Sequence, residues 1–514
     1  MDTSFPLSAG TEDEEEFDVT EPVADRMATQ EDSLEDPLPT EVVIDPVGAR
    51  KELHCEIIIG ATRQGKERLV DSDGYSYVMR RAWASGKKAW RCSVRSKALS
   101  CGASMQQDGQ TFRRGPQAHC HPAKPGIGTA TKITAAIKEK AAANVFKSAS
   151  NIVESVINNY STEVQSQPAC SQSSISSLVR QANRHRQKMR PKEPTDIDFT
   201  LNTDHIPADF LRADVKLNGA RHLVFATSDQ LCLLKNAKTW YMDGTFKIVK
   251  EPFTQLFSIH AFLKGENGNI KQTPLVMVLM SRRKTKDYIA VLRAILELMN
   301  GETSMEKAVL DFEAAAWKAC RKVLTSNIQG CSFHWTQAIW RKVQNLGLAT
   351  TYKDTPAAHD YIRAIMALPF LPSEHIIPAF EHLERRSTAA FAGLVQYVRD
   401  TWIQSSKWSP DTWSVYNQPV RTNNDVEGWH RRLNNKSGRS SIQFYLLLPL
   451  LYEESRFVTL QARLVKNNKL QRYQRKTFRN RQGRFFELWK QYAKDEISTF
   501  SLLKAVSYLN GPNE

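Results

Sequence analysis

The chain has 514 residues and a net charge of +15, with 41% hydrophobic and 24% charged residues. This length predicts two to four domains, and the composition is that of a folded protein rather than a fibrous or disordered one. The apolar runs fall short of the ~20 residues that a membrane helix needs, the N-terminus lacks a secretory signal, and eight cysteines are too few for a disulfide scaffold. We therefore expect an intracellular protein with no membrane segment.

Charge is distributed unevenly along the chain. Residues 1–48 contain fifteen Asp or Glu residues and one Arg, a net of −14, which leaves +29 for the rest. A body this basic is expected to bind a polyanion through its phosphates. Residues 1–50 have several prolines and no hydrophobic periodicity, so they are expected to form a disordered acidic tail. Such a tail shields the basic body, contacts a partner or is simply solvated.

Residues 53–123 have aromatic residues, cysteines and short alternating runs, which predict a small domain of strands. Two thiols and two imidazoles suit tetrahedral Zn²⁺, and the domain offers them at Cys92, Cys101, His119 and His121. Cys120 is a lower-ranked alternative ligand, and Cys55 is expected to lie outside the site. A domain this small would depend on the metal for stability. The alternative is a small β-domain with incidental Cys and His residues.

Residues 124–194 lose the aromatic residues of the preceding domain. An Ala/Lys-rich stretch at about 131–159 predicts a helical segment, and the Ser/Gln-rich residues 165–177 predict a flexible linker. The basic residues 184–192 that follow are either a nuclear localisation signal or a solvated linker.

From residue 195 the pattern is again that of a folded domain. Helices and strands alternate in an order that we expect to be helix 228–237, strands 239–249, 253–263 and 273–280, a helix through 289–299, strand 307–311, helix 313–324 and a strand near 330–333. This order predicts a three-stranded meander that passes into right-handed crossovers, giving a mixed sheet covered by helices. Residues 335–420 and 422–508 are expected to be mainly helical.

Three acidic residues stand where such a sheet would bring them together. Asp243 lies within the first strand of the meander, Asp311 ends the strand 307–311, and Glu427 lies near the start of a helix with an apolar stripe. Adjacent strands are ~4.8 Å apart, so the two aspartates could share divalent cations. Three carboxylates around Mg²⁺ or Mn²⁺ support phosphodiester chemistry. Singly, each acid reads as an ordinary turn or cap residue, so the prediction depends on all three together.

The blocks around these acids resemble those of a known family. They are WYMDGTFKIVKEPFTQLFSIHAF, DFEAAAWKA, GCSFHW and TNNDVEGWHRRLN, and over roughly residues 215–440 they resemble the Mutator-like element (MULE) transposase domain. The segment 69–121, which reads LVDSDGYSYV…WRC…CGA…HCH, resembles a FLYWCH-type zinc finger in which Val70 takes the place of the opening Phe. A FLYWCH finger ahead of a MULE core is an arrangement found in animal transposases.

The resemblance implies an RNase H-like fold with a DDE triad at Asp243, Asp311 and Glu427, which would bind Mg²⁺ or Mn²⁺. It also implies that His334, in a Cys-x-x-His pair with Cys331, supports the active site by positioning DNA at the scissile phosphate. A buried Cys and a helix-start His are the alternative. The long separation between the second and third acids makes residues 335–420 a helical insertion.

Further residues are expected to contact DNA. Aromatic residues of the insertion either stack on unpaired bases or form its core, namely Trp335, Trp340, Trp402, Trp408 and Trp413. Residues 456–490 contain eleven Lys or Arg residues and one acid, which predicts a basic helical stripe on phosphates or a solvated face. The residues that we expect to bind DNA are Arg431, Arg432, Lys436, Arg472, Arg475, Lys476 and Arg479.

The fold expected from these patterns is α/β, with an RNase H-like mixed sheet as catalytic core, a helical insertion and a small zinc-bound β-rich finger. Its parts are an acidic tail (1–50), the finger (53–123), a helical segment with a basic linker (124–194), the first part of the core (195–334), the insertion (335–420), the end of the core (421–455) and a basic helical region (456–514).

The expected function is that of a nuclear Mutator-like DNA transposase, which cleaves double-stranded DNA at the element ends and transfers the strand to target DNA. Structural Zn²⁺ in the finger and catalytic Mg²⁺ or Mn²⁺ are its expected cofactors, and it acts either as a monomer or as a homo-oligomer. One alternative is a domesticated transposase that serves as a non-catalytic DNA-binding regulator of transcription. Another is an RNase H-like nuclease without strand transfer.

Overall fold

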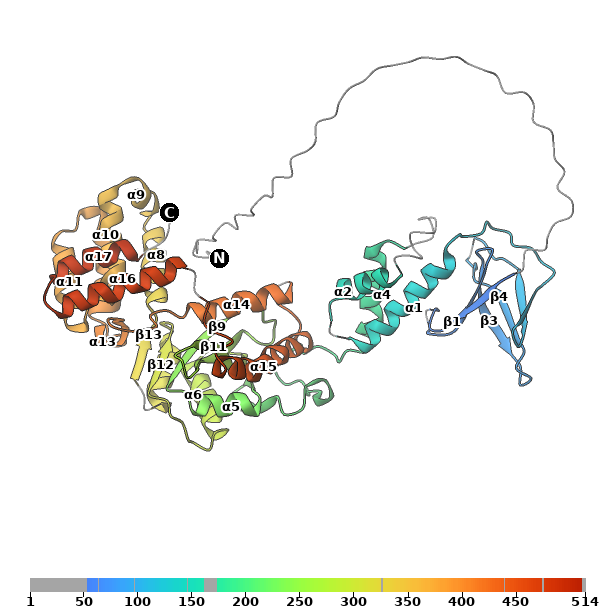
Figure 1. The fold of residues 1–514 in the computed structure, drawn as a ribbon, viewed down its shortest axis with the longest axis horizontal. Helices are drawn as coiled ribbons and strands as arrows, with labels where there is room; N and C mark the ends of the chain where they lie inside the picture. The colour runs from blue at the N-terminus through green and yellow to red at the C-terminus, as the bar shows by residue number, and fades with distance from the viewer. Residues whose placement is uncertain are drawn as a thin grey trace, which may run out of the picture. The chain divides into compact units, whose positions relative to one another are not determined.

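The structure, a computed structural model, describes residues 53–160 and 173–510 apart from positions 63, 97, 146, 325, 326, 439, 474 and 475. The predicted acidic tail, residues 165–172 of the predicted linker and Arg475 therefore lie outside the described residues. The described chain forms two compact units, one up to Arg190 and one from Pro191 onward, which we treat separately (Figure 1). None of its described helices is long and apolar enough to cross a membrane.

The first unit begins with a six-stranded antiparallel sheet in which each strand pairs with the next along the chain. Its strands are β1 (Cys55–Ile58), β2 (Arg68–Asp71), β3 (Ser76–Ala82), β4 (Lys88–Cys92), β5 (Ser104–Asp108) and β6 (Thr111–Arg114). Leu69, Tyr77 and Trp90 are fully buried in one hydrophobic core. At Gly74 the backbone has φ +90°, and a Cβ would lie 2.9 Å from the carbonyl oxygen of Lys124. This turn therefore requires glycine.

Three helices complete the first unit: α1 (Ile127–Ala143), α2 (Ala149–Asn159) and α4 (Ile175–Gln187). The chain turns between α1 and α2, so the single helical segment expected at 131–159 is two helices. Helix α4 was not expected, because a polar Ser/Gln composition favours a linker. Its few apolar residues lie four apart, and Leu178 and Ala182 are buried against the core that Ile133 and Val153 provide.

The second unit is built on a seven-stranded mixed sheet with the order β13-β12-β9-β10-β11-β8-β7. Strands β9, β12 and β13 are parallel, and all other pairs are antiparallel. The strands are β7 (Leu211–Leu217), β8 (Ala220–Phe225), β9 (Thr239–Thr245), β10 (Gln255–Lys264), β11 (Ile270–Met280), β12 (Lys307–Leu310) and β13 (Asn327–Gly330). The structure thus confirms a mixed sheet with many helices beside a separate antiparallel sheet.

Helices cover both faces of this sheet, with α6 and α14 on opposite sides of the strands (Figure 1). Helices α5 (Ser228–Lys235), α6 (Thr285–Glu297) and α7 (Ala314–Val323) pack with Trp240 and Met242 of β9 in one core. Tyr241, which points to the other face, packs against Val426 of α14 (Asn424–Ser437). The long helix α15 (Phe444–Lys466) contacts both α14 and β11.

The remaining helices form a layer with its own core. They are α8 (Ser332–Asn345), α9 (Ala349–Asp354), α10 (Pro356–Ala367), α11 (Ser373–Arg385), α12 (Ala392–Val398), α13 (Pro410–Trp413), α16 (Lys476–Ala493) and α17 (Thr499–Leu509). Phe485 and Trp489 of α16 are buried in the same core as Trp335 of α8. Part of the basic region at 456–514 therefore belongs structurally to the helical layer.

Candidate functional site

Four Cys and His residues of the first unit converge on one point. Each offers one ligand atom, and these atoms all lie within 4.8 Å of one another, in the group Cys92, Cys101, His119 and His121. Cys92 Sγ lies 3.2 Å from His121 Nε2, and Cys101 Sγ lies 3.5 Å from His119 Nδ1. The side chain of Cys120 is exposed, and Cys55 lies outside the group. Two thiols and two imidazoles at this spacing fit a closed tetrahedral metal site.

Hydrogen bonds around the cluster point the correct ring nitrogens inward. The Tyr77 hydroxyl donates to Asp71 Oδ2 at 2.9 Å, so it must accept from Nε2–H of His119, also at 2.9 Å. This leaves the lone pair of His119 Nδ1 facing the thiols. His121 Nδ1 lies 2.9 Å from the carbonyl oxygen of Pro122, which frees its Nε2 in the same way. Such outer contacts orient metal-binding histidines.

A second constellation lies on the α14 face of the mixed sheet. Strand β9 alternates, so Tyr241 and Asp243 point to that face while Trp240 and Met242 point away. Strand β12 runs parallel to β9 and pairs Val309 with Tyr241. Two residues further along, on the same face, β9 reaches Asp243 and the segment that follows β12 reaches Asp311. The parallel register thus brings the two predicted aspartates side by side.

Helix α14 supplies the third carboxylate because its apolar side is fixed on the sheet and on α15. Val426 and Leu433 are fully buried. Trp429 donates from Nε1 to the buried carboxylate of Glu454 at 2.9 Å, which anchors the helix to α15. Glu427, next to Val426, then faces the two aspartates. A group of three potential ligand atoms within 4.8 Å is formed here by Asp243, Glu427 and His430.

Two histidines touch these carboxylates. His334, in the first turn of α8, places Nε2 3.4 Å from Glu427 Oε1. His430 places Nδ1 3.8 Å from Asp243 Oδ2, and its Nε2 lies 3.4 Å from the Ser258 hydroxyl. No role was predicted for His430. It stands three residues after Glu427, and this spacing puts both side chains on one helix face, so the sequence did contain the signal.

Burial and crowding shift the proton affinities of the cluster. Burial raises the pKa of Asp243 well above its usual range, and the charges of Glu427 and Asp311 add to this while His334 opposes it. Burial likewise raises the pKa of Asp311. For Glu427 burial acts in the same direction, but the contact with His334 wins and lowers its pKa.

The two histidines differ in charge. Burial lowers the pKa of His430 to about 4, so its ring is neutral at pH 7. Burial would also lower the pKa of His334, but Cys331, Glu427 and Asp243 outweigh it and raise that pKa well above the usual value. His334 therefore carries a positive charge that offsets part of the carboxylate cluster.

The donor set fits a divalent cation. Among the described residues, Asp243 Oδ2 is a buried oxygen with no hydrogen-bond partner. An unpaired buried carboxylate oxygen is costly, and a bound cation would remove that cost. The carboxylates of Asp243, Asp311 and Glu427 are ligands that suit Mg²⁺ or Mn²⁺, and the neutral imidazole of His430 favours a transition metal.

The residues expected to bind DNA fall into three groups. Arg432 and Lys436 both pair with the buried carboxylate of Glu454, Lys436 at 2.6 Å. Arg472 forms an ion pair with Asp425. Exposed positions are held by Arg431, Lys476 and Arg479. Three of the predicted contacts therefore have carboxylate partners within the protein.

The tryptophans of the insertion form its core. Trp335 stacks on Trp413 with ring centroids 4.4 Å apart, and Trp402 packs across Trp335 at 4.7 Å. Trp340 is also buried, and Trp408 is partly buried against the same cluster. These residues were expected either to stack on unpaired bases or to form the core of the insertion, and the structure shows that they form the core.

Comparison of the chain with models of known protein families gives no match, and comparison with curated proteins gives none either. What the protein does is therefore inferred from its two sites. One is a Cys/His cluster in a small sheet, and the other is a buried carboxylate cluster at the junction of a mixed sheet and a helix.

Proposed function

We propose that this chain is a DNA transposase of the Mutator-like type, in which Asp243, Asp311 and Glu427 act on phosphodiester bonds. The observation that carries the proposal is that Asp243 and Glu427 offer ligand atoms within 4.8 Å of each other, with Asp311 at the end of the strand next to that of Asp243. Asp243 lies on the central strand β9, Asp311 directly follows the adjacent parallel strand β12, and Glu427 lies on a helix packed across both. The neighbouring strands β11-β10-β9-β12-β13, antiparallel as far as β9 and parallel from β9 to β13, support the RNase H-like core that the resemblance implies.

Asp243, Asp311 and Glu427 would hold Mg²⁺ or Mn²⁺, with His430 as a neighbouring nitrogen donor. When bound, such ions activate the attacking oxygen and stabilise the leaving 3′-oxygen. The charged His334 lies beside Glu427 and would contact the non-bridging oxygens of the scissile phosphate. The oxygen of water bonds to phosphorus as the bond to the 3′-oxygen breaks, which leaves a 5′-phosphate and a free 3′-hydroxyl. This hydroxyl would then bond to a phosphorus of target DNA, whose own 3′-oxygen leaves as a hydroxyl.

The Cys/His cluster supports the second half of the proposal. A zinc ion held by Cys92, Cys101, His119 and His121 would fix the six-stranded sheet as a DNA-recognition finger. The carboxylate site alone does not choose a DNA sequence, since it acts on the backbone that all DNA shares. The finger would therefore supply the site recognition.

The test of the proposal is cleavage by the full chain, with added Mg²⁺ or Mn²⁺, of a duplex carrying the inverted repeats that flank its gene. Asp243→Asn, Asp311→Asn and Glu427→Gln should each lower cleavage by more than about 100-fold, because a direct metal ligand matters more than its outer contacts. Strand transfer should fail with cleavage, since both steps use the same carboxylates.

Exposed acids outside the two ligand groups provide matched controls. Asp204→Asn and Glu297→Gln make the same chemical changes at exposed positions and should leave cleavage unchanged. Full cleavage by the three site variants would reject the assignment. A wild-type chain that binds one DNA sequence but never cleaves it would instead indicate a DNA-binding regulator.

A further inference from the structure

An exposed aromatic ring and an arginine form a pair beside the carboxylate cluster. Phe246 comes directly after the end of β9 and three residues after Asp243, so the Cα atoms of the two residues are at most about 11 Å apart. It is 49% exposed although it is a large apolar residue. The guanidinium carbon of Arg283 lies 4.6 Å from the centre of its ring. This pair takes no part in the core of the protein.

The turn that carries Phe246 is firmly held. Ile248 and Val249, directly after it, are buried. The backbone N–H groups of Ser441 and Ile442 donate to the carbonyls of Lys247 and Ile248 at 2.8 and 3.0 Å. The exposure of Phe246 is therefore a property of a fixed backbone, and its ring is displayed to solvent at a defined place.

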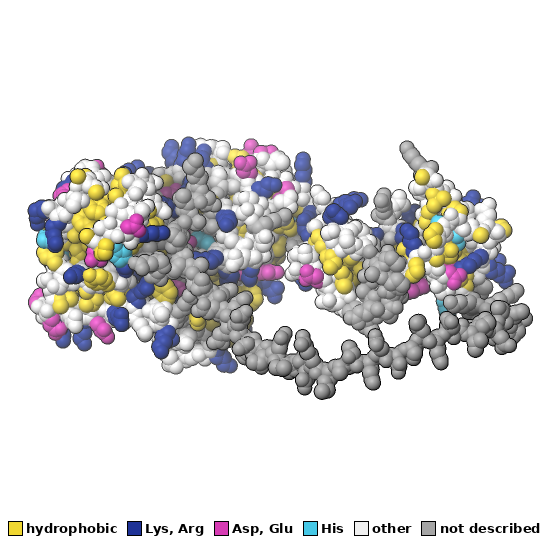
Figure 2. Space-filling view, turned by 90° about the horizontal axis from the view of Figure 1, so that it is seen from above, with side chains coloured by type: hydrophobic (Ala, Val, Ile, Leu, Met, Phe, Trp, Pro, Cys, Tyr) yellow, Lys and Arg dark blue, Asp and Glu magenta, His cyan; other side chains and the backbone are white. Residues whose placement is uncertain are grey.

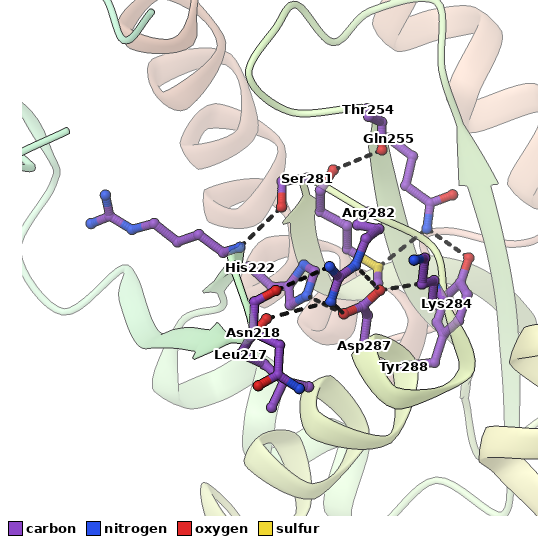
Figure 3. Close-up of polar contacts among 12 residues, drawn as sticks. Leu217, Asn218, His222, Thr254, Gln255, Ser281, Arg282, Lys284, Asp287 and Tyr288 are labelled. Carbon is purple, nitrogen blue, oxygen red and sulfur yellow. Dashed lines mark hydrogen bonds and ion pairs between the residues drawn. The ribbon is translucent and has the colours of Figure 1, made fainter. Parts of the chain in front are cut away.

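The loop that carries Arg283 is also held, by its two neighbours (Figure 3). Arg282 donates two hydrogen bonds of 2.9 Å to the buried carboxylate of Asp287 and reaches the carbonyls of Leu217 and Asn218. The backbone N–H of Lys284 donates to the same carboxylate at 2.8 Å. Arg283 lies between these anchors, yet in the part of the chain that the structure describes it makes no hydrogen bond or ion pair.

Arg283 lies near the carboxylate site because it packs on Phe246, which is three residues from Asp243 along the chain. The guanidinium of Arg283 is thus close to the site and available to a ligand.

We propose that Phe246 and Arg283 bind one unpaired nucleotide of the DNA strand whose phosphate lies at the carboxylates. The base stacks on Phe246, and Arg283 contacts the neighbouring phosphate. An aromatic face beside a free cation is the combination by which proteins hold single-stranded nucleic acid. A fully paired duplex offers no free base face. This inference rests on the proposed function and extends it: the site prefers DNA that is locally unpaired next to the cleaved bond.

The test measures binding to a duplex with a short single-stranded 3′ tail that contains 2-aminopurine, a base whose fluorescence falls when it stacks. The full chain is used in the Asp243→Asn background, which prevents cleavage. Phe246→Leu keeps the apolar volume and removes the aromatic face, so it should weaken binding of the tailed duplex by about 5- to 150-fold and abolish the fluorescence change. Binding of the blunt duplex should change little.

Two further variants complete the experiment. Arg283→Gln should weaken binding of the tailed duplex, and Arg283→Lys should restore part of it through the retained charge. Phe500→Leu, at a phenylalanine that is 45% exposed in α17, is the matched control and should bind like the parent chain.

The outcomes separate this inference from the proposed function. If the wild type cleaves but Phe246→Leu binds tailed and blunt duplexes like its parent, the stacking site is refuted and the transposase proposal stands. If the wild type is inert but Phe246→Leu still loses selectivity for the tailed duplex, the nucleotide site stands and the catalytic proposal fails. An equal loss of affinity for both duplexes would mean that Phe246 and Arg283 form only a general phosphate contact, and it would overturn the inference.

Discussion

At the scale of single residues, the carboxylate cluster lowers the stability of the folded protein. Asp243 is buried beside two other acids, with the charged His334 as a partial counterweight. Its raised pKa means that the folded protein prefers the protonated side chain. The stability that the neutral form provides is complete below the ordinary value of 3.8 and is lost as the pH rises through the higher folded-state pKa.

Asp243→Asn should therefore raise the melting temperature at neutral pH when no Mg²⁺ or Mn²⁺ is present. The reason is that the amide removes a buried charge that nothing neutralises. The gain, on the order of 1–2 °C for each kcal/mol in a unit of this size, should shrink as the pH is lowered toward 3.8. Calorimetry over a pH series, in metal-free buffer without a strong chelator, measures it. Adding Mn²⁺ should stabilise the wild type but not the variant, and equal stabilisation of both would contradict a metal site here.

Residue types and spacing pointed to all four residues of the Cys/His group and to Asp243 and Glu427 of the second group, which also contains His430 and does not include Asp311. Asp243 and Asp311 follow from a period-two pattern in two strands that pair in parallel. His430 was missed because a histidine in an amphipathic helix is usually an ordinary core residue. The ion pairs of Arg432 and Arg472 were missed as well, since their partners Glu454 and Asp425 become neighbours only when α14, α15 and the segment after α15 pack.

At the scale of elements, we expect the six-stranded sheet of the first unit to depend on metal held by its Cys/His cluster. Cys101 is buried in the cluster, whereas Cys120 stands between His119 and His121 in sequence but is exposed. The two cysteines therefore form a matched pair for testing whether the cluster binds zinc.

Cys101→Ser should lose zinc and unfold the sheet, because zinc binding contributes apparent free energies of about 10–16 kcal/mol in finger peptides. Cys120→Ser should keep one zinc per chain and its strands. Metal analysis together with circular dichroism distinguishes the two variants. A folded Cys101→Ser chain with full zinc content would reject this ligand set.

Element prediction succeeded where hydrophobic runs were long and failed where polar composition concealed a buried side. The strands of the meander and the helix α5, with its Thr227 capping box, appear close to where they were expected. The hairpin β7–β8 was not predicted, although Asn218 and Gly219 at its tip, with φ values of +46° and +70°, are a strong hairpin signal. The insertion was correctly expected to be helical, but the participation of α16 and α17 in its core depends on contacts distant in sequence.

At the scale of the whole molecule, positive charge is widely spread. Figure 2 shows Lys and Arg side chains across both units on the face in view, rather than in a single stripe. Such a distribution favours general attraction to phosphates over one narrow contact line.

Binding of the full chain to duplex DNA should consequently weaken steeply with salt. An interface with 6–10 phosphate contacts loses about 10³–10⁵ in affinity between 50 and 200 mM salt, and a titration over that range measures the slope. Deleting residues 1–48 should tighten non-specific binding if their acids shield the body. A tail of equal length with Asn and Gln in place of its acids should behave like the deletion. Affinity that is flat in salt would contradict a phosphate-dominated interface.

Helices α16 and α17 complete the core of the helical layer, and this affects the order in which the parts of a newly synthesised chain can fold. Chains grow from the N-terminus at about 5–20 residues per second, and each part can fold only when its contacts have been made. The core begun at Trp335 stays open until Trp489 has been synthesised. Because His334 belongs to the same helix as Trp335, the carboxylate cluster cannot gain its fixed positive neighbour earlier. The first unit, by contrast, has all its described residues long before. If the proposed function is right, a growing chain would take up zinc and recognise DNA while it is still unable to cut it.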